Sequence, residues 1–117
     1  MAGLGQLERS VMDALWESDA PLTAYDVQER IGGEKQPAVT TVLTVLARLE
    51  KKGFVAPDKS SRPHRYRPVA SRADHVAELM HEVLGDARDR RAVLERFVGG
   101  VSAEDAAVLR RLLDADG

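Results

Sequence analysis

The sequence predicts a mainly α-helical fold with one small β hairpin, followed by a second, purely helical region. In the first half of the chain, apolar residues recur at spacings of three and four in three separate stretches, as on the buried side of amphipathic helices. Two short strand-like stretches come next, and Pro57, Pro63 and Pro68 restrict them to a two-stranded ribbon. From Ser71 onward only helical periodicity remains, so we expect two domains, residues 1–70 and 71–117.

The first two helices are indicated by their spacing and by their ends. Apolar side chains recur through the first helix, which the stretch SDAPL ends: Leu4, Leu7, Val11, Met12, Leu15 and Trp16. Thr23 and Asp26 have the spacing of a capping box, so the second helix begins there, and Leu22 and Val27 are placed for a hydrophobic staple around it. Gly32–Gly33 predicts its end.

The third helix lies in the stretch TTVLTVLARLEKKGFV and has two different faces. Pro37 suits its first turn and Gly53 its C-cap. At 100° per residue the apolar side chains fall on one side: Val42, Val45, Leu46 and Leu49. The opposite side carries Thr40, Thr44, Arg48 and Lys51, with Thr41 at its edge. Threonine is a poor helix former, whereas its methyl and hydroxyl groups suit thymine methyls and the oxygen atoms of bases or phosphates. This face therefore indicates contact with DNA, and an ordinary solvated face is the alternative.

The stretches FVAP and HRYRPV predict two strands, which the polar and basic linker DKSSR joins. Arg62, His64, Arg65 and Arg67 give this hairpin many cations, which favours contact with phosphates or entry into a minor groove. Tyr66 alternates with the arginines and is expected to point inward. Three helices followed by a basic hairpin predict a winged helix-turn-helix domain.

The region after Ser71 predicts helices whose apolar stripes need a partner. Two stripes precede Gly99–Gly100, where we expect the chain to break, and a capping box at Ser102 and Asp105 opens a last helix. A segment of this length cannot bury these stripes by itself. The simplest explanation is that a second copy of the chain covers them. The candidate interface residues are Leu79, Val83, Leu94, Phe97, Leu109 and Leu112.

The charge distribution is more informative than the formal net charge of −2. Residues 1–34 carry two basic and seven acidic residues, a net charge of −5. Residues 35–68 carry eight basic and two acidic residues, +6, and residues 69–117 carry seven and ten, −3. The positive charge is therefore concentrated in the predicted third helix and hairpin, which favours an anionic partner.

Several functional classes have no support in the sequence. Without cysteine there are no disulfides, zinc–thiolate sites or thiol nucleophiles, which fits a reducing cytoplasm. We find no phosphate-binding loop, nucleophile elbow or catalytic triad pattern, so we expect no catalytic residues, no enzyme activity and no cofactor. His75 and His81 are six positions apart and share no helix face, so we expect solvated side chains and no metal site. No stretch has transmembrane length, and no signal peptide is visible, so we expect a cytoplasmic protein without a membrane partner.

Three stretches resemble the penicillinase-repressor family of bacterial transcriptional regulators, the BlaI/MecI/CopY type: LGQLERSVMDALWE, TTVLTVLARLEKKGFV and HRYRPV. The resemblance extends into LERFVGGVSAEDAAVLRRLL and covers nearly the whole chain. It implies a homodimeric repressor in which the winged helix binds an operator, an inverted repeat in double-stranded DNA, and the C-terminal helices form the dimer. The copper-responsive branch uses cysteine motifs, which this chain lacks. The alternative function is a winged-helix module that binds protein without specific DNA binding, and the salt dependence of DNA binding separates the two.

The candidate DNA-binding residues are Ala38, Thr40, Thr41, Thr44, Arg48, Lys51, Arg62, His64 and Arg65. In the antibiotic-resistance branch, a membrane sensor-protease pathway leads to cleavage of the repressor in its dimer region. The resemblance aligns ERFVGG with that segment and implies a scissile bond between Arg96 and Phe97. The family favours asparagine before the phenylalanine, whereas this chain has arginine. The alternative, which we favour, is that Phe97 is an aromatic residue of the dimer core.

Overall fold

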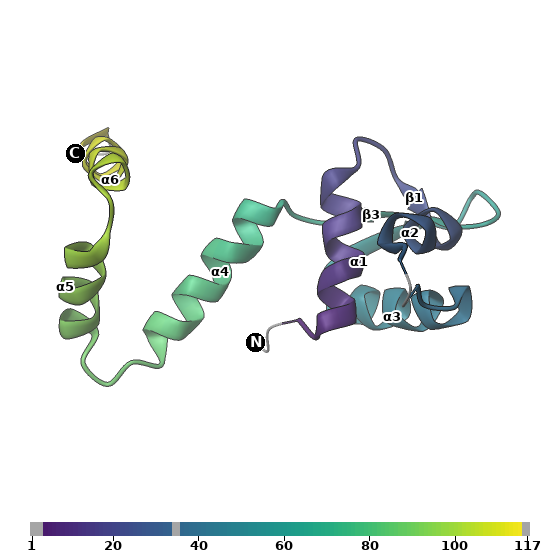
Figure 1. Ribbon diagram of the computed structural model, residues 1–117, viewed down its shortest axis with the longest axis horizontal. Coiled ribbons are helices and arrows are strands. Elements are labelled where there is room, and N and C mark those ends of the chain that lie inside the picture. Colours follow the sequence, from purple (N-terminus) through teal and green to yellow (C-terminus); the bar gives the residue numbers. More distant parts are fainter. Residues whose placement is uncertain (1–3, 34–35, 116–117) are drawn as a thin grey trace. The chain divides into compact units, whose positions relative to one another are not determined.

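The computed structural model describes residues 4–33 and 36–115, which divide into two compact units, Met1–Leu79 and Met80–Gly117. The first unit contains three helices and a small sheet, and the hairpin loop of the sheet extends away from the helices (Figure 1). The unit boundary lies within a helix and nine residues after the predicted domain boundary, because the first part of that helix packs onto the first unit.

The sheet of the first unit has three strands. Its elements are α1 (Gln6–Glu17), β1 (Leu22–Thr23), α2 (Ala24–Ile31), α3 (Val39–Lys51), β2 (Val55–Asp58) and β3 (Arg65–Pro68). The strand order is β1-β3-β2, and both pairings are antiparallel. Leu22 lies opposite Tyr66 and Thr23 opposite Arg65. The hairpin of β2 and β3 was predicted, but the prediction of a two-stranded ribbon was wrong, because β1 adds a strand to the other edge of β3.

The core of this unit consists of the apolar faces of its three helices, closed by the sheet. Val42, Leu46 and Leu49 of α3 are fully buried, and Val45 is nearly so, which confirms the predicted inner face of that helix. The cluster continues through α1, α2 and the strands: Val11, Met12, Ala14, Leu15, Leu22, Ala24, Val27, Val55 and Tyr66. The buried position of Tyr66 confirms that it points inward.

The start of α2 and the end of α3 follow local sequence signals. The capping box that opens α2 is complete, since the backbone N–H of Asp26 bonds Thr23 Oγ1 at 3.1 Å and the N–H of Thr23 bonds Asp26 Oδ2 at 3.0 Å. After α3, Gly53 has a φ of +86° and its N–H bonds the Glu50 carbonyl, while the Phe54 N–H bonds the Leu49 carbonyl. These two bonds form a Schellman motif, which places Gly53 just beyond the cap residue.

The start of α3 differs from the prediction. We expected Pro37 in the first turn, but the N-cap is Ala38 and the helix begins at Val39. The Pro37 carbonyl instead accepts a hydrogen bond of 2.9 Å from the side-chain amide of Gln28 on α2. The proline therefore belongs to the connection between the two helices.

The beginning of α4 (Arg72–Gly85) is fixed to α1 by a cluster around Trp16. The indole Nε1–H of Trp16 donates a hydrogen bond of 2.9 Å to the Ala70 carbonyl, and the guanidinium of Arg72 lies 5.5 Å from the centre of the indole ring. His75 is 5% exposed, with its ring centre 5.3 Å from that of Trp16 and 5.2 Å from that of Phe54. The prediction of a solvated His75 was therefore wrong, because this position of α4 faces two aromatic rings.

The second unit consists of the end of α4, α5 (Arg90–Gly100) and α6 (Ala103–Ala115). Neither α5 nor α6 contains a buried residue. Ser102 Oγ accepts a hydrogen bond of 3.0 Å from the Asp105 N–H, as expected at the start of α6. Gly99–Gly100 was expected to break the chain, but α5 continues through both glycines and ends after them. In the described part of the chain, no helix combines the length and the apolar character that a membrane span requires.

Candidate nucleic-acid interface

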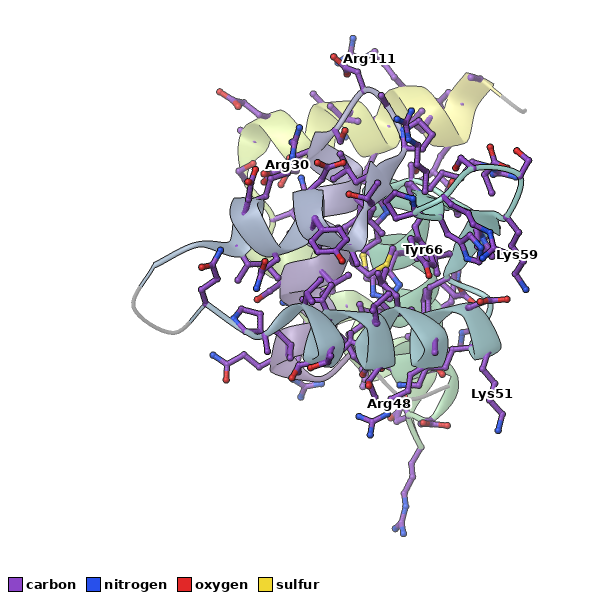
Figure 2. The ribbon with its side chains drawn as sticks, turned by 90° about the vertical axis from the view of Figure 1, so that its right-hand side faces the viewer. Arg30, Arg48, Lys51, Lys59, Tyr66 and Arg111 are labelled. Atoms are coloured by element: carbon purple, nitrogen blue, oxygen red, sulfur yellow. The ribbon has the colours of Figure 1, made fainter. Side chains whose placement is uncertain are left out.

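The outer face of α3 is polar, basic and accessible. Thr40, Thr41, Thr44, Arg48 and Lys51 are all exposed, on the side opposite the buried valines and leucines. Figure 2 shows Arg48 and Lys51 extending outward from the helix, whereas Tyr66 lies in the interior. The helix brings two kinds of group to one surface, threonines that can contact bases and cations that can contact phosphates.

Hydrogen bonds at this face show which of its groups are already engaged. The hydroxyl of Thr44 donates to the Thr40 carbonyl at 3.0 Å, so its methyl group and the lone pairs of its oxygen remain for a ligand. Lys52, at the C-cap of α3, is held by Glu8 of α1 through bonds of 2.8 and 3.1 Å. The hydrogen bond from Lys52 is the main reason that the pKa of Glu8 lies below its usual value. Lys52 is therefore part of the packing of α3 on α1.

The hairpin presents its cations on the outer side of β3. Arg65 and Arg67 are exposed on either side of the buried Tyr66, as expected for alternating positions of a strand. Burial raises the pKa of the Tyr66 phenol, and the charge of Glu50 contributes in the same direction. The turn is ordered by Asp58, whose carboxylate accepts hydrogen bonds from the hydroxyl and the backbone N–H of Ser60, and these bonds lower the pKa of Asp58.

Arg65 lies close to two carboxylates. It contributes, as a minor cause, to the lowered pKa of both Asp26 and Asp58; the main causes are hydrogen bonds from Thr23 and Ser60 respectively. Arg65 and Arg62 are both exposed, and Arg62 lies nearer the tip of the hairpin.

Most of the predicted DNA-binding residues line one of two separate hollows. Thr41, Thr44 and Arg48 line a shallow depression that Gln6 and Glu8 of α1 complete. Arg62 and half-buried His64 line a second hollow, of about 240 Å³, together with these other residues: Ala24, Tyr25, Leu43, Pro63 and Tyr66. The tip of the hairpin thus lies beside α3. Of the other candidates, Ala38 is exposed at the N-cap of α3.

Sequence reasoning did not select Tyr25 and Leu43. Tyr25 is 57% exposed in the first turn of α2, and Leu43 is 44% exposed on α3. The sequence held a signal for Leu43, because on a helical wheel it falls outside the arc of the buried residues. The predicted inner face named only Val42, Val45, Leu46 and Leu49, and Leu43 was given no role.

The candidate interface and cleavage residues of the second region lie on largely uncovered helices. Leu79 and Leu109 are half-buried, whereas the others are exposed: Val83, Leu94, Phe97 and Leu112. The bond between Arg96 and Phe97 lies inside α5, where the Arg96 guanidinium bonds the Ala92 carbonyl at 3.3 Å.

Helices α1 to α3 and the three-stranded sheet define a winged helix-turn-helix with an accessible third helix. A solved MarR family protein from Bacillus stearothermophilus is similar to the chain at a TM-score of 0.53, with 18% identity, over 97% of this chain and 73% of that one. This similarity supports the fold alone. The family model for the penicillinase repressor matches residues 4–115. The chain is 46% identical over 113 residues to the "Transcriptional regulator BlaI" of Mycobacterium tuberculosis strain CDC 1551 / Oshkosh, covering 94% of this chain and 82% of that protein. The same values hold for the protein of strain ATCC 25618 / H37Rv. The chain therefore belongs to the penicillinase repressor family.

Proposed function

We propose that this protein is a dimeric, sequence-specific DNA-binding repressor of transcription. The observation that carries the proposal is the accessible outer face of α3, on which threonines and cations lie opposite a completely buried apolar face. The basic hairpin of the same compact unit supports it, as does the similarity to a transcriptional regulator of M. tuberculosis.

In this proposal α3 enters the major groove. Thr40, Thr41 and Thr44 contact base edges, and Ala38 approaches the DNA at the start of the helix. The cations hold phosphates on either side of the groove: Arg48, Lys51, Arg62, His64 and Arg65. Base contacts then determine which sequence is bound, and phosphate contacts determine position and affinity.

A salt titration of DNA binding, followed by fluorescence anisotropy, tests this division of roles. The logarithm of the binding constant should fall with the logarithm of salt concentration by about 0.9 for each neutralised phosphate. Arg65→Ala should weaken binding to all sequences alike and reduce that slope by about one, whereas Thr44→Ala should alter preference among sequences. Unchanged affinity and slope for Arg65→Ala would remove the hairpin from the interface. A wild-type protein without salt-dependent DNA binding would instead favour a protein-binding module.

The dimer is proposed to form through residues 71–117. Apolar side chains on α4, α5 and α6 are largely exposed in the single chain, with Val83 at 73% and Leu112 at 62%. Burying one such side chain contributes roughly 1.5–3 kcal/mol, so a symmetric interface of a few of them suffices for association. In a dimer with a two-fold axis, the second DNA contact is intramolecular, which raises the affinity for DNA by about 10²–10⁴. The same axis predicts that the operator is an inverted repeat.

Leu112→Asp tests the dimer. We expect sedimentation to give a monomeric mass, circular dichroism to show that the winged helix remains folded, and gel shift to show much weaker operator binding. A wild-type protein that sediments as a monomer at micromolar concentration and still binds its operator tightly would contradict the proposal.

Release by proteolysis between Arg96 and Phe97, in a pathway with a sensor-linked protease, is the second part of the proposal. A protease binds its substrate in extended form, so α5 would have to unwind locally before cleavage. Mass spectrometry of the protein from induced cells should detect a fragment that ends at Arg96. Intact chain under every inducer would favour the alternative role of Phe97 in the dimer core.

A further inference from the structure

Two exposed apolar side chains of the winged helix line the same hollow. Among the described residues before α4, the large apolar side chains that are exposed are Tyr25, Leu43 and Val69. Tyr25 and Leu43, from different helices, both line the hollow of about 240 Å³ beside the hairpin, and Ala24, Pro63 and the buried Tyr66 complete its apolar wall. Uncovered apolar surface is unfavourable in water, so this site gains free energy when an apolar group fills it.

The rim of the hollow has the opposite character. Arg62 and His64 of the hairpin line it, and Arg62 is exposed. An apolar wall with a cationic rim matches a thymidine unit of DNA, in which the C5-methyl group projects into the major groove near an anionic backbone. A protein partner is a poorer match, because a stable protein interface buries about 800 Å² on each side. The exposed apolar side chains that line the hollow are only Tyr25, Leu43 and Pro63.

The arrangement of α3 is consistent with this occupant. At 100° per residue, Leu43 and Ala47 lie on one side of the line through Thr40 and Lys51, and Thr41 and Arg48 lie on the other. The helix therefore has an apolar edge next to the hairpin and a polar edge next to α1, where Thr41 and Arg48 line the second depression. The two edges would select different chemical groups in the major groove.

We propose that Leu43, supported by Tyr25, is a specificity-determining residue that selects thymine by packing against its C5-methyl group. The inference rests on the proposed DNA binding and extends it, because it names the base that the apolar edge of α3 selects. Arg62 at the rim holds a phosphate of the same strand. Thymine and cytosine are distinguished here by shape, through a methyl group that only one of them carries.

Replacement of single thymines by uracil in the operator, itself selected from a random DNA pool, tests the proposal because uracil lacks only the methyl group. For the wild-type protein, we expect one thymine per half-site at which uracil weakens binding about fourfold, the equivalent of about 0.8 kcal/mol for one buried methylene-sized group. For Leu43→Ala we expect weaker binding to the thymine operator and no further loss with uracil at that position. Leu43→Met keeps an apolar contact and should retain the sensitivity.

Val69→Ala is the matched control, since it also shortens an exposed apolar side chain of the same unit but does not line the hollow, and it should leave the uracil effect at that thymine intact. Circular dichroism establishes that each variant is folded, as expected for exposed positions. If the wild-type protein binds its operator specifically but Leu43→Ala keeps the uracil profile of the wild type, the Leu43 assignment is wrong and the DNA-binding function stands. If the wild-type protein binds no DNA specifically, both proposals are wrong.

Discussion

The buried imidazole of His75 leads to a prediction whose magnitude follows from its surroundings. His75 is packed between Trp16 and Phe54, and neither of its ring nitrogens has a hydrogen-bond partner among the described residues. Burying an unpartnered polar group costs about 1–3 kcal/mol in proteins. His75→Phe removes that cost and keeps an aromatic ring against both neighbours, and an adjoining cavity of about 240 Å³ leaves room for the larger ring. We expect the free energy of unfolding to rise by about 1–2 kcal/mol, after a small loss to overpacking.

Urea unfolding followed by tryptophan fluorescence measures this effect. Trp16 is the single tryptophan of the chain and contacts His75, so its signal reports on this part of the fold. The midpoint should rise at an unchanged slope, and the melting temperature should rise by about 4–8 °C per kcal/mol. His81→Phe is the matched control, since His81 is exposed on the same helix, and its effect should stay within about 0.5 kcal/mol. A lower midpoint for His75→Phe would refute the reasoning, because it would mean that the imidazole makes a favourable polar interaction.

Other predictions concern the caps and the pH dependence of stability. Thr23→Ala removes one half of the capping box of α2 and should lower the free energy of unfolding by about 1 kcal/mol in urea titrations. Gly53→Ala should lower the free energy of unfolding by about 1–2 kcal/mol, because the φ of +86° is unfavourable for alanine although no atom obstructs the new methyl group. An unchanged free energy of unfolding would disprove this. The pKa of Glu8 is lowered by Lys52 in the folded protein, so its contribution to stability is present above the ordinary carboxyl pKa and disappears as the pH falls through the lowered value. In the Glu8→Gln variant, the melting temperature should therefore fall less steeply below about pH 4 than in the wild type, when thermal unfolding is measured across a range of pH.

Most features that depend on neighbours in the sequence were predicted well, although the local signals at Pro37 and Gly99–Gly100 misplaced two helix ends. The buried face of α3 follows from helical periodicity, and the cap at Thr23 and Asp26 follows from two residues three positions apart. Features that depend on contacts between residues far apart in the sequence were not predicted. The strand β1 has two residues, too few for any periodicity, and exists because Leu22 meets Tyr66. The burial of His75 depends on Trp16 and Phe54, which no local pattern of α4 reveals.

The candidate DNA-binding surface was predictable for a related reason. The threonines and cations of α3 are exposed because they lie opposite its buried face, so helical geometry alone places them on the outside. The hollow beside Leu43 could not be predicted, because it is formed by α2, α3 and the hairpin together. The exposed and buried faces of a single helix can be predicted from the sequence. A concave site formed by several elements can be predicted only when the packing of those elements is known.

The two residues of β1 also determine how the hairpin can move. Thr23 pairs with Arg65, at the loop end of β3, and its side chain at the same time caps α2, so the last strand pair before the loop and the first turn of that helix meet at one residue. Because β3 is paired along both edges, bending it at this point would disturb the sheet and the cap together. In the proposed DNA complex, we therefore expect any adjustment of the hairpin to a groove in residues 59–64, between the paired strands. In that complex, DNA that fits only after the whole hairpin tilts would bind more weakly, because the tilt disturbs the β1–β3 pairing and the cap of α2.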